Sequence, residues 1–323
     1  MLERSIRISI YACLASAPFS VTISQAALAV GAALLVTKLL ISRDLTPLKS
    51  PFNKFILIYL TIQLLALLFS YRISNSLVEF IQNDWLILAY FLVIYSLKAD
   101  DHLSKAVNIL IISSSIMAVY GIYQHFTGVD LIHGETLTRR GNFFRAAGNF
   151  KLCLTYGGFQ MAVLGLVLGL GMHLKSGKSK YLYLSSSVVI LASLIASYAR
   201  SAWLGFIAMT FFGGLIKGKK YVLYVIAGLI LVGAFLFVFH PALIYQHGLL
   251  SMIDISENMP YNNLVRIKLW GTALKIVADY PILGVGQGNF TYFIEKYKIP
   301  FNYRGIRSLH SDPLTFAVNS GVL

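Results

Sequence analysis

The chain has 323 residues, of which 57% are apolar and only 12% are charged, and its mean hydropathy is +0.71. Soluble domains are roughly 45–50% apolar and about 25% charged. The composition therefore excludes a soluble single-core enzyme, a disordered chain, a collagen-like fibre and a disulfide-stapled secreted domain. Lys and Arg number 27 against 13 Asp and Glu, for a net charge of +14. In a chain this apolar, the excess indicates loops sorted by a membrane, with some cations available to an anionic substrate.

Apolar runs suitable for membrane-spanning helices recur along the chain. Crossing about 30 Å of hydrocarbon takes roughly 20 apolar residues in a helix, and lipid does not tolerate an open sheet edge. After a shorter run over Ser5–Ala17, stretches with few or no charges cover Ser20–Ile41, Phe55–Tyr71, Trp85–Leu97, Ala106–Phe126, Leu152–Leu174, Tyr181–Tyr198, Ser201–Ile216 and Tyr221–Phe239. We therefore expect an all-α integral membrane protein with about nine complete transmembrane helices and a truncated tenth.

Pro18 interrupts a charge-free stretch that runs from Ile8 to Thr37, so this stretch is either one long kinked helix or a helical hairpin that turns at Pro18. Short cytoplasmic loops carry an excess of Lys and Arg. Only the hairpin places Arg4 and Arg7 on the same side as the Lys-rich loops, such as those at residues 175–180 and 217–220. The positive-inside rule thus favours the hairpin and a cytoplasmic N-terminus.

The predicted spans divide the chain into five parts. Residues 1–126 hold five N-terminal spans, and residues 152–239 hold four central spans. Two segments predicted to lie outside, residues 127–151 and residues 240–312, are too long to be simple connectors. Residues 313–323 begin another charge-free helix that rises only about 16 Å. Because that length cannot cross a bilayer, we expect the chain to be a fragment cut within its tenth span.

The longer outer segment contains a predicted amphipathic helix from Asn263 to Tyr280. Asn263 is placed to cap it, and Asp279-Tyr280-Pro281 would end it. Apolar positions recur at helical spacing and alternate with three cations. The apolar positions are Leu264, Ile267, Leu269, Trp270, Ala273, Leu274 and Val277, and the cations are Arg266, Lys268 and Lys275.

The sequence contains no motif for nucleotide or metal binding. The absence of a G-x-x-x-x-G-K-[ST] loop argues against ATP-driven transport by this chain. The seven histidines show neither H-E-x-x-H nor a comparable spacing. No metal or other cofactor is therefore predicted. Cys13 and Cys153, in or beside predicted spans, are expected to be small packing residues.

His310 is the one histidine in a distinctive context. It lies in Ser308-Leu309-His310-Ser311-Asp312-Pro313, where the longer outer segment is predicted to re-enter the bilayer. It could be an interfacial histidine that caps a helix beside Asp312. Alternatively, it could act as a general base for a hydroxyl at the outer surface, because the pKa of histidine is ordinarily about 6.5.

Five arginines predicted to lie outside are candidates for binding an anion. Arg200 is the only charge between two apolar runs, and an ionisable residue at membrane depth is a functional candidate by default. Instead of binding a ligand, Arg200 could simply be a charged residue in a short outer turn. Arg266 could likewise lie on a solvated helix face without binding a ligand. Arg139, Arg140 and Arg145 cluster in residues 127–151, where loose attraction to lipid phosphates is the alternative. Guanidinium groups bind phosphates in a bidentate manner, so these arginines could converge on a diphosphate.

Gly284, Gly286 and Gly288 form a G-x-G-x-G run directly after the amphipathic helix. The run is not a dinucleotide fingerprint, because no strand precedes it and no βαβ unit surrounds it. It predicts a turn where the backbone passes close to another element or to a ligand. If the backbone approaches a ligand, Gly286 and Gly288 are candidate substrate contacts.

Three segments resemble the O-antigen ligase and O-antigen polymerase family of multi-spanning bacterial membrane proteins. The first, Ala199–Gly205, contains Arg200. The second, the most specific, runs from Arg266 through Trp270 and Asp279-Tyr280-Pro281 to Phe290 and includes the glycine run. The third is His310-Ser311-Asp312-Pro313-Leu314. Ala199 replaces the usual serine, and Ser311-Asp312 stands where relatives often carry His-Asn, which leaves the choice of acceptor open.

The resemblance implies glycan transfer on the periplasmic face of the bacterial inner membrane. The donor would be a glycan linked through diphosphate to undecaprenol, and the acceptor a sugar hydroxyl. The acceptor is lipid A–core in a ligase and another lipid-linked repeat unit in a polymerase. Neither a metal, a nucleotide sugar nor a nucleic acid is implied.

The same resemblance suggests roles for individual residues. Arg200 and Arg266 would hold and stabilise the departing diphosphate, with Arg145 as a further contact. His310 would accept or orient the proton of the attacking hydroxyl, giving inversion at the anomeric carbon.

Two other functions are compatible with the sequence: a polymerase, which uses a different acceptor, and a transporter, which is a different class of protein. The position of His310, after one large outer segment and just before a span, favours a ligase over a polymerase. A transporter for a lipid or a small anion would be expected to show ionisable residues in several spans and internal repeats. The sequence shows neither feature.

Overall fold

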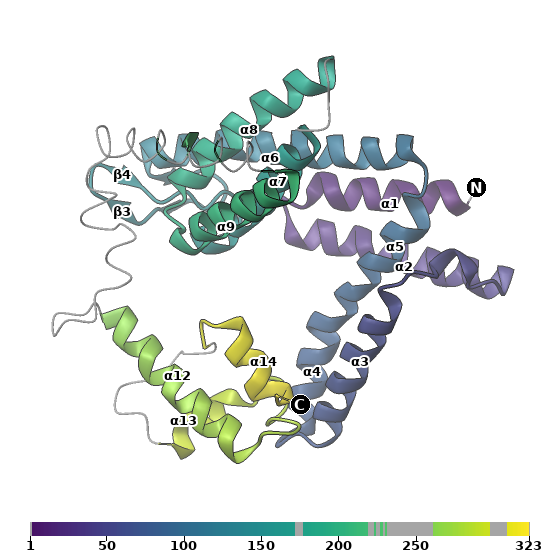
Figure 1. The fold of residues 1–323 in the computed structure, drawn as a ribbon, viewed down its shortest axis with the longest axis vertical. Helices are drawn as coiled ribbons and strands as arrows, with labels where there is room; N and C mark the ends of the chain where they lie inside the picture. The colour runs from purple at the N-terminus through teal and green to yellow at the C-terminus, as the bar shows by residue number, and fades with distance from the viewer. Residues whose placement is uncertain are drawn as a thin grey trace. The chain divides into compact units, whose positions relative to one another are not determined.

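The computed structural model describes residues 2–171, 177–218, 261–297 and 309–322, together with residues 223, 227, 228 and 230. Those residues are mostly helical (Figure 1). The chain divides into two compact units. The first unit comprises Met1–Arg43 and Leu92–Ile253, and the second comprises Asp44–Phe91 and Asp254–Leu323.

The first unit begins with a helical hairpin. Helix α1 (Leu2–Ser16) and helix α2 (Val21–Ser42) lie side by side in Figure 1. The Ser24 hydroxyl on α2 donates to the Cys13 carbonyl on α1 at 3.1 Å. Further along, a Cβ on Gly31 would lie 2.3 Å from the Ser9 Oγ, so the small glycine lets the helices approach closely. The predicted hairpin at Pro18 is therefore confirmed.

The core of the first unit lies among four further helices. They are α6 (Asp100–Thr127), α7 (Cys153–Gly171), α8 (Lys178–Ala196) and α9 (Arg200–Lys217). Apolar side chains buried between them include Ile111, Leu164, Ile190 and Leu194. Between α6 and α7, β1 (Val129–Asp130) pairs antiparallel with β2 (Glu135–Thr136), and β3 (Arg139–Arg140) pairs antiparallel with β4 (Phe143–Phe144). The predicted outer segment 127–151 is thus a pair of tight hairpins.

The second unit packs the C-terminal part of the chain onto a helical hairpin. The hairpin consists of α3 (Asn53–Leu68) and α4 (Ile73–Asn83), after the short 3-10 helix η1 (Thr46–Leu48). Helix α4 continues through the 3-10 helix η2 (Asp84–Ile87) into α5 (Leu88–Ser96). The C-terminal part supplies α12 (Tyr261–Asp279), α13 (Phe290–Lys296) and α14 (Asp312–Ser320). Its core contains Leu269, Ile276, Val285, Phe293 and Val318.

Four of the described helical stretches are long and apolar enough to cross a membrane: Val21–Ser42, Ile73–Ser96, Asp100–Thr127 and Cys153–Gly171. Three shorter apolar helices cover Asn53–Leu68, Lys180–Ala196 and Arg200–Ile216. The structure therefore supports an all-α membrane protein. The number of spans and the side that each loop faces remain predictions.

The structure modifies two of the predicted spans and leaves a third largely undescribed. The span predicted at Trp85–Leu97 belongs to a longer helical stretch that begins at Ile73. Helix α1, also expected to span, is only 15 residues long and is therefore shorter than the roughly 20 residues that a membrane crossing needs. The span predicted at Tyr221–Phe239 falls largely outside the described residues.

Helix α12 confirms the predicted amphipathic helix but corrects its start and its buried face. It begins at Tyr261, ahead of the proposed Asn263 cap, and ends at Asp279 as expected. Leu264, Ile267 and Leu274 are 40%, 46% and 59% exposed, whereas Leu269, Thr272, Ala273 and Ile276 are buried. The buried stripe follows the i, i+3, i+4, i+7 spacing from Leu269, because α12 packs on one narrow face against its neighbours. Leu264, Ile267 and Leu274 form a second, exposed stripe.

Candidate functional site

The α8–α9 turn of the first unit places three arginines next to Tyr198. Arg145 Nη2 donates to the Tyr198 carbonyl at 3.3 Å. Arg200, the first residue of α9, donates its backbone N–H to the same carbonyl at 3.1 Å. Burial raises the pKa of the Tyr198 phenol, and the positive charge of Arg140 acts in the opposite direction. The structure therefore brings Arg140, Arg145 and Arg200 to one turn.

Arg139 has a different environment from these three. It belongs to the same strand as Arg140, but its Nε donates within its own hairpin to the Gly141 carbonyl at 3.0 Å. Its side chain is exposed. A substrate-binding role for Arg139 remains a prediction.

The α8–α9 turn is tight, and small buried residues allow it to form. Tyr198 adopts a positive φ of 52°, and the Ser197 hydroxyl accepts the Ala199 backbone N–H at 3.1 Å. A Cβ on Gly157 of α7 would lie 2.5 Å from the Ala199 Cβ. Ala199 itself is completely buried. Ala199 thus packs directly against α7.

Arg145 has a side-chain donor that is placed to bind a ligand. Its Nε is buried and has no hydrogen-bond partner among the residues that the structure describes. Buried polar groups are nearly always hydrogen-bonded in native proteins. A buried guanidinium donor without a partner in the described part of the chain therefore marks a position where an anion can bind.

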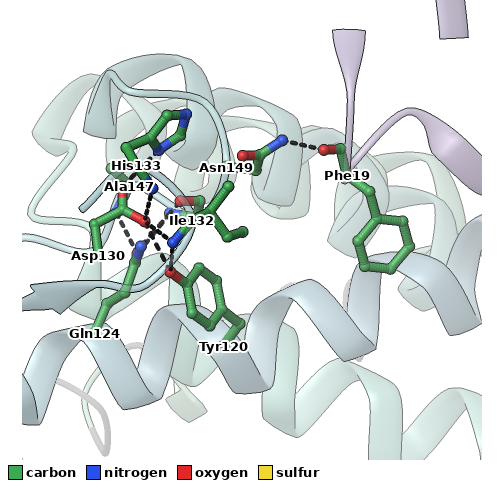
Figure 2. A network of polar contacts seen from close by, with 9 residues as sticks. Phe19, Tyr120, Gln124, Asp130, Ile132, His133, Ala147 and Asn149 are labelled. Carbon is green, nitrogen blue, oxygen red and sulfur yellow. Dashed lines mark hydrogen bonds and ion pairs between the residues drawn. The ribbon is translucent and has the colours of Figure 1, made fainter. Parts of the chain in front are cut away.

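A polar network holds the backbone that carries Arg145 (Figure 2). The Gln124 side chain of α6 accepts the N–H groups of Ala147 and Gly148 at 3.1 and 2.8 Å. It also donates to the Gly148 carbonyl at 3.0 Å. One completely buried amide thus fixes three backbone groups directly after Arg145.

Asp130 organises the preceding hairpin in the same network (Figure 2). Its carboxylate accepts the Tyr120 hydroxyl at 2.8 Å, the Ile132 N–H at 3.0 Å and the His133 Nδ1 at 2.7 Å. Burial alone would raise the pKa of Asp130, but these hydrogen bonds outweigh it and lower the pKa. His133 could not be singled out from the sequence, because its spacing from Asp130 matches no metal-binding motif.

In the second unit, α12 fixes the backbone beside His310. Trp270 Nε1 donates to the Leu309 carbonyl at 3.0 Å, and Leu309 is buried in the core of this unit. Arg266 lies one turn before Trp270 on the same helix, so the two share a face. His310 is exposed, adopts a positive φ of 53° and directly precedes Ser311, the N-cap position of α14. The second unit therefore brings the backbone of His310 close to the helix that carries Arg266.

The glycine run confirms the predicted close approach of backbone to another element. Gly284, Gly286 and Gly288 all adopt positive φ. A Cβ on Gly286 would lie 2.2 Å from the Ser70 Cβ, and a Cβ on Gly288 would lie 2.8 Å from the Glu79 Cγ. Gly286 and Gly288 therefore allow the loop to pack on the α3–α4 hairpin, whereas a Cβ on Gly284 would meet the backbone at the end of α14. Contact of Gly286 and Gly288 with substrate remains a prediction.

The same loop is tied down by backbone hydrogen bonds on both sides. The Val285 N–H donates to the Val318 carbonyl at 2.8 Å, and the Gly286 N–H donates to the Asn319 carbonyl at 3.0 Å. In turn, the Val285 carbonyl accepts the Tyr71 N–H at 3.1 Å. The loop thus joins the end of α14 to the α3–α4 turn.

Gln287 is the centre of a buried polar network that sequence reasoning missed. Its Nε2 donates to Gln63 Oε1 at 2.8 Å and to Asp84 Oδ2 at 3.0 Å. Asp84 Oδ1 also accepts the Tyr59 hydroxyl at 2.5 Å, and Gln63 Oε1 accepts the Ser320 hydroxyl at 3.1 Å. A carboxylate in the apolar stretch Ile73–Ser96 was the available signal, because ionisable residues within spans mark functional sites.

A cavity of about 380 Å³ opens beside this network within the second unit. Its walls come from α3, α4, η2, the glycine run, the start of α13, and α14. The lining residues are Tyr59, Gln63, Glu79, Asn83, Asp84, Gln287, Gly288, Phe290, Thr291, Leu309, Asp312, Thr315, Phe316, Asn319 and Ser320. His310 lies in sequence between two of them, Leu309 and Asp312.

Comparison with known families identifies the C-terminal region. Residues 185–323 match the model of a family described as O-antigen ligase. The match confirms the resemblance to that family, and together with the apolar helices it supports a multi-pass bacterial membrane protein. The matched range includes Arg200, Arg266, the glycine run and His310, whereas Arg139, Arg140 and Arg145 precede it. No curated protein matches the chain.

Proposed function

We propose that this chain is a glycan ligase, which transfers a glycan from undecaprenyl diphosphate to a sugar hydroxyl of lipid A–core on the periplasmic face of the inner membrane. The O-antigen ligase match over residues 185–323 supports the class of reaction. The observation that carries the proposal for this chain is the arginine site at Tyr198, where Arg145 keeps a buried donor without a described partner.

The arginine site has the chemistry to hold the diphosphate of the donor. As the glycan leaves, negative charge develops on the diphosphate, and fixed cations stabilise that charge more than they stabilise the ground state. Guanidinium groups present paired donors to phosphate oxygens. Arg145 and Arg200 are the primary contacts in this proposal, and Arg139 and Arg140 add positive charge nearby. Arg266 keeps the diphosphate-binding role that the family resemblance implies for it.

His310 supplies the base. In the proposed step, the acceptor hydroxyl oxygen forms a bond to the anomeric carbon while the bond from that carbon to the diphosphate oxygen breaks. The proton of the hydroxyl passes to His310, and undecaprenyl diphosphate leaves with the electron pair of the broken bond. Attack opposite the leaving group inverts the anomeric carbon. The exposed position of His310 is suited to meeting an acceptor hydroxyl.

The test uses the complete gene in a strain that lacks it, with lipopolysaccharide and the lipid-linked glycan pool analysed side by side. For a ligase, the empty strain accumulates long lipid-linked chains and carries bare lipid A–core. If only single repeat units accumulate, the protein is a polymerase instead. If neither long lipid-linked chains nor single repeat units accumulate, both activities are contradicted. That result would point to the transport of a lipid or small anion.

Three variants test the residue roles in the same strain. Arg145→Ala, Arg266→Ala and His310→Ala should each fail to restore glycan on lipid A–core. Lys275→Ala is the matched control, because Lys275 is an exposed cation on the same helix as Arg266. Normal lipopolysaccharide from all three variants would refute the assignment of the site.

A further inference from the structure

The cavity of the second unit differs from the arginine site in its charge. Its described lining contains three carboxyl groups, those of Glu79, Asp84 and Asp312, and no Lys or Arg side chain. A diphosphate would be repelled by such a wall. The cavity is therefore unsuited to the charged part of the proposed donor, and it calls for a different ligand.

The polar groups of the lining match a ring that carries several hydroxyls. Carboxylates accept hydrogen bonds, side-chain amides both donate and accept, and hydroxyls do either. The amides of Gln63, Asn83 and Asn319 and the hydroxyls of Thr291 and Thr315 supply this mixture. Neighbouring hydroxyls of a sugar need such mixed partners at short range.

Aromatic rings provide the apolar faces that the C–H surface of a sugar ring requires. Tyr59 and Phe316 are stacked, with centroids 6.4 Å apart and planes 24° apart, and both line the cavity. Phe290 lines it as well. Polar groups set against apolar walls are typical of small-molecule sites, and about 380 Å³ lies at the lower end of their roughly 300–1,000 Å³ range.

Some side chains that line the cavity are held in place by hydrogen bonds, and others are available to bond to a ligand. Gln63, Asp84 and Gln287 are held by the buried network described above. By contrast, the side chains of Thr291, Asp312 and Asn319 make no hydrogen bond to any residue in the described part of the chain. A ligand would therefore be held against prearranged walls and would bond to groups that the fold leaves available.

We propose that this cavity binds the acceptor, a neutral hydroxyl-rich sugar ring, and presents its reacting hydroxyl to His310. The inference rests on the proposed function and deepens it, because it assigns the acceptor to a cavity of its own within the second unit. A divalent cation is a poorer match, since the described residues include no group of three or more His, Cys, Asp or Glu side chains that could hold a metal.

The test measures binding and transfer separately, with the full-length protein in detergent or nanodiscs. Binding is followed by saturation-transfer NMR with free core oligosaccharide as the probe. Asn319→Ala removes an available amide but keeps the backbone carbonyl that accepts the Gly286 N–H. Thr291→Phe fills the cavity from the exposed start of α13. Lys275→Ala is again the control, and thermal unfolding checks that each variant is folded.

In the transfer assay, Asn319→Ala should raise the KM for acceptor about 3- to 10-fold, as expected for one lost hydrogen bond. The KM for the lipid-linked donor should be unchanged. Thr291→Phe should abolish the saturation-transfer signal. Undiminished oligosaccharide binding by both folded variants, or a rise in the donor KM instead, would overturn the acceptor site. Oligosaccharide binding by a protein that transfers no glycan would support the cavity assignment and overturn the proposed function.

Discussion

Trp270 and Leu309 are joined by a hydrogen bond of 3.0 Å from the indole Nε1 to the backbone carbonyl. The two residues are far apart in the sequence, and the bond connects α12 to the peptide that precedes His310. An indole donor on a helix is a rigid support, because its ring has only two rotatable side-chain bonds. Trp270 is therefore a positioning residue for His310, although it touches no proposed reacting atom.

Trp270→Phe should lower kcat about 10-fold and leave both KM values nearly unchanged. Phe keeps most of the apolar contact but removes the donor, so the Leu309 carbonyl is no longer held and His310 loses its fixed orientation. The measurement is steady-state transfer across a range of pH, because a displaced base alters the pH profile of kcat. An unaltered profile with only reduced thermal stability would show that Trp270 is merely structural. Lys275→Ala serves as the control on the same helix.

Gly286→Ala should destabilise the second unit by about 2–4 kcal/mol, from the strain of a positive φ and from overpacking. Gly286 has φ of 85°, and its added Cβ would lie 2.2 Å from the Ser70 Cβ. Thermal or denaturant unfolding of purified protein measures the change. Ser70→Gly in the same chain should restore part of the loss, since it removes the nearest clash but leaves the backbone strain and the 2.6 Å approach to Ser76 Oγ.

Gly271→Ala is the matched control for that experiment. Gly271 lies on α12, and an added Cβ there would meet nothing within 4 Å. Alanine in a helix is favoured over glycine by roughly 0.5–1 kcal/mol, so this variant should be neutral or slightly more stable. Equal effects of the two alanines would contradict the packing role of the glycine run.

Gln287→Met should cost about 1–3 kcal/mol, because it leaves the buried Asp84 and Gln63 oxygens without their shared donor. Methionine is similar in length, so the loss reports the hydrogen bonds rather than a cavity. Gln82→Met is the control, because Gln82 is exposed on α4. Unfolding midpoints of the two variants should differ clearly, and coincident midpoints would argue against the network.

Local patterns in the sequence predicted most of the helices. The positive-inside argument selected the hairpin at Pro18, and the Ser24 to Cys13 hydrogen bond confirms it. The spacing of apolar residues predicted α12, and the residues Asp279-Tyr280-Pro281 predicted its end. The buried face was predicted less well, because Leu264 and Leu269 are equally apolar and only tertiary packing decides which is covered.

Contacts between distant parts of the chain could not be predicted in the same way. Gln63 and Asp84 meet Gln287 only because the glycine run folds onto the α3–α4 hairpin. No spacing rule relates positions more than 200 residues apart. The arginines were identified from the sequence because they are cations predicted to lie outside the membrane. The convergence of Arg140, Arg145 and Arg200 at Tyr198 depends on two β-hairpins, which the sequence pattern does not indicate.

The Asp130 network gives stability that should depend on pH. In the folded protein the pKa of Asp130 lies below its ordinary 3.8, so the folded state resists protonation more than the unfolded state does. The stabilisation is complete above the unfolded pKa and is lost as the pH falls through the folded pKa. Asp130→Asn should therefore be less stable than wild type at pH 7, and the difference should shrink towards pH 3. Unfolding midpoints measured at each pH test this, and a difference that persists at low pH would contradict it.

Inorganic diphosphate should inhibit transfer in competition with the lipid-linked donor, because it carries the anion that the arginine site is proposed to hold. The buried Arg145 Nε is the donor without a described partner, so the effect should depend on Arg145. Arg145→Lys keeps the positive charge but removes the planar paired donors, and it should raise the donor KM and the inhibition constant about 10-fold each. The acceptor KM should stay the same, because the acceptor is assigned to the cavity lined by Asp312 and Asn319. If diphosphate competes with the acceptor instead of the donor, it binds at the acceptor site. That result would contradict the assignment of donor and acceptor to different sites.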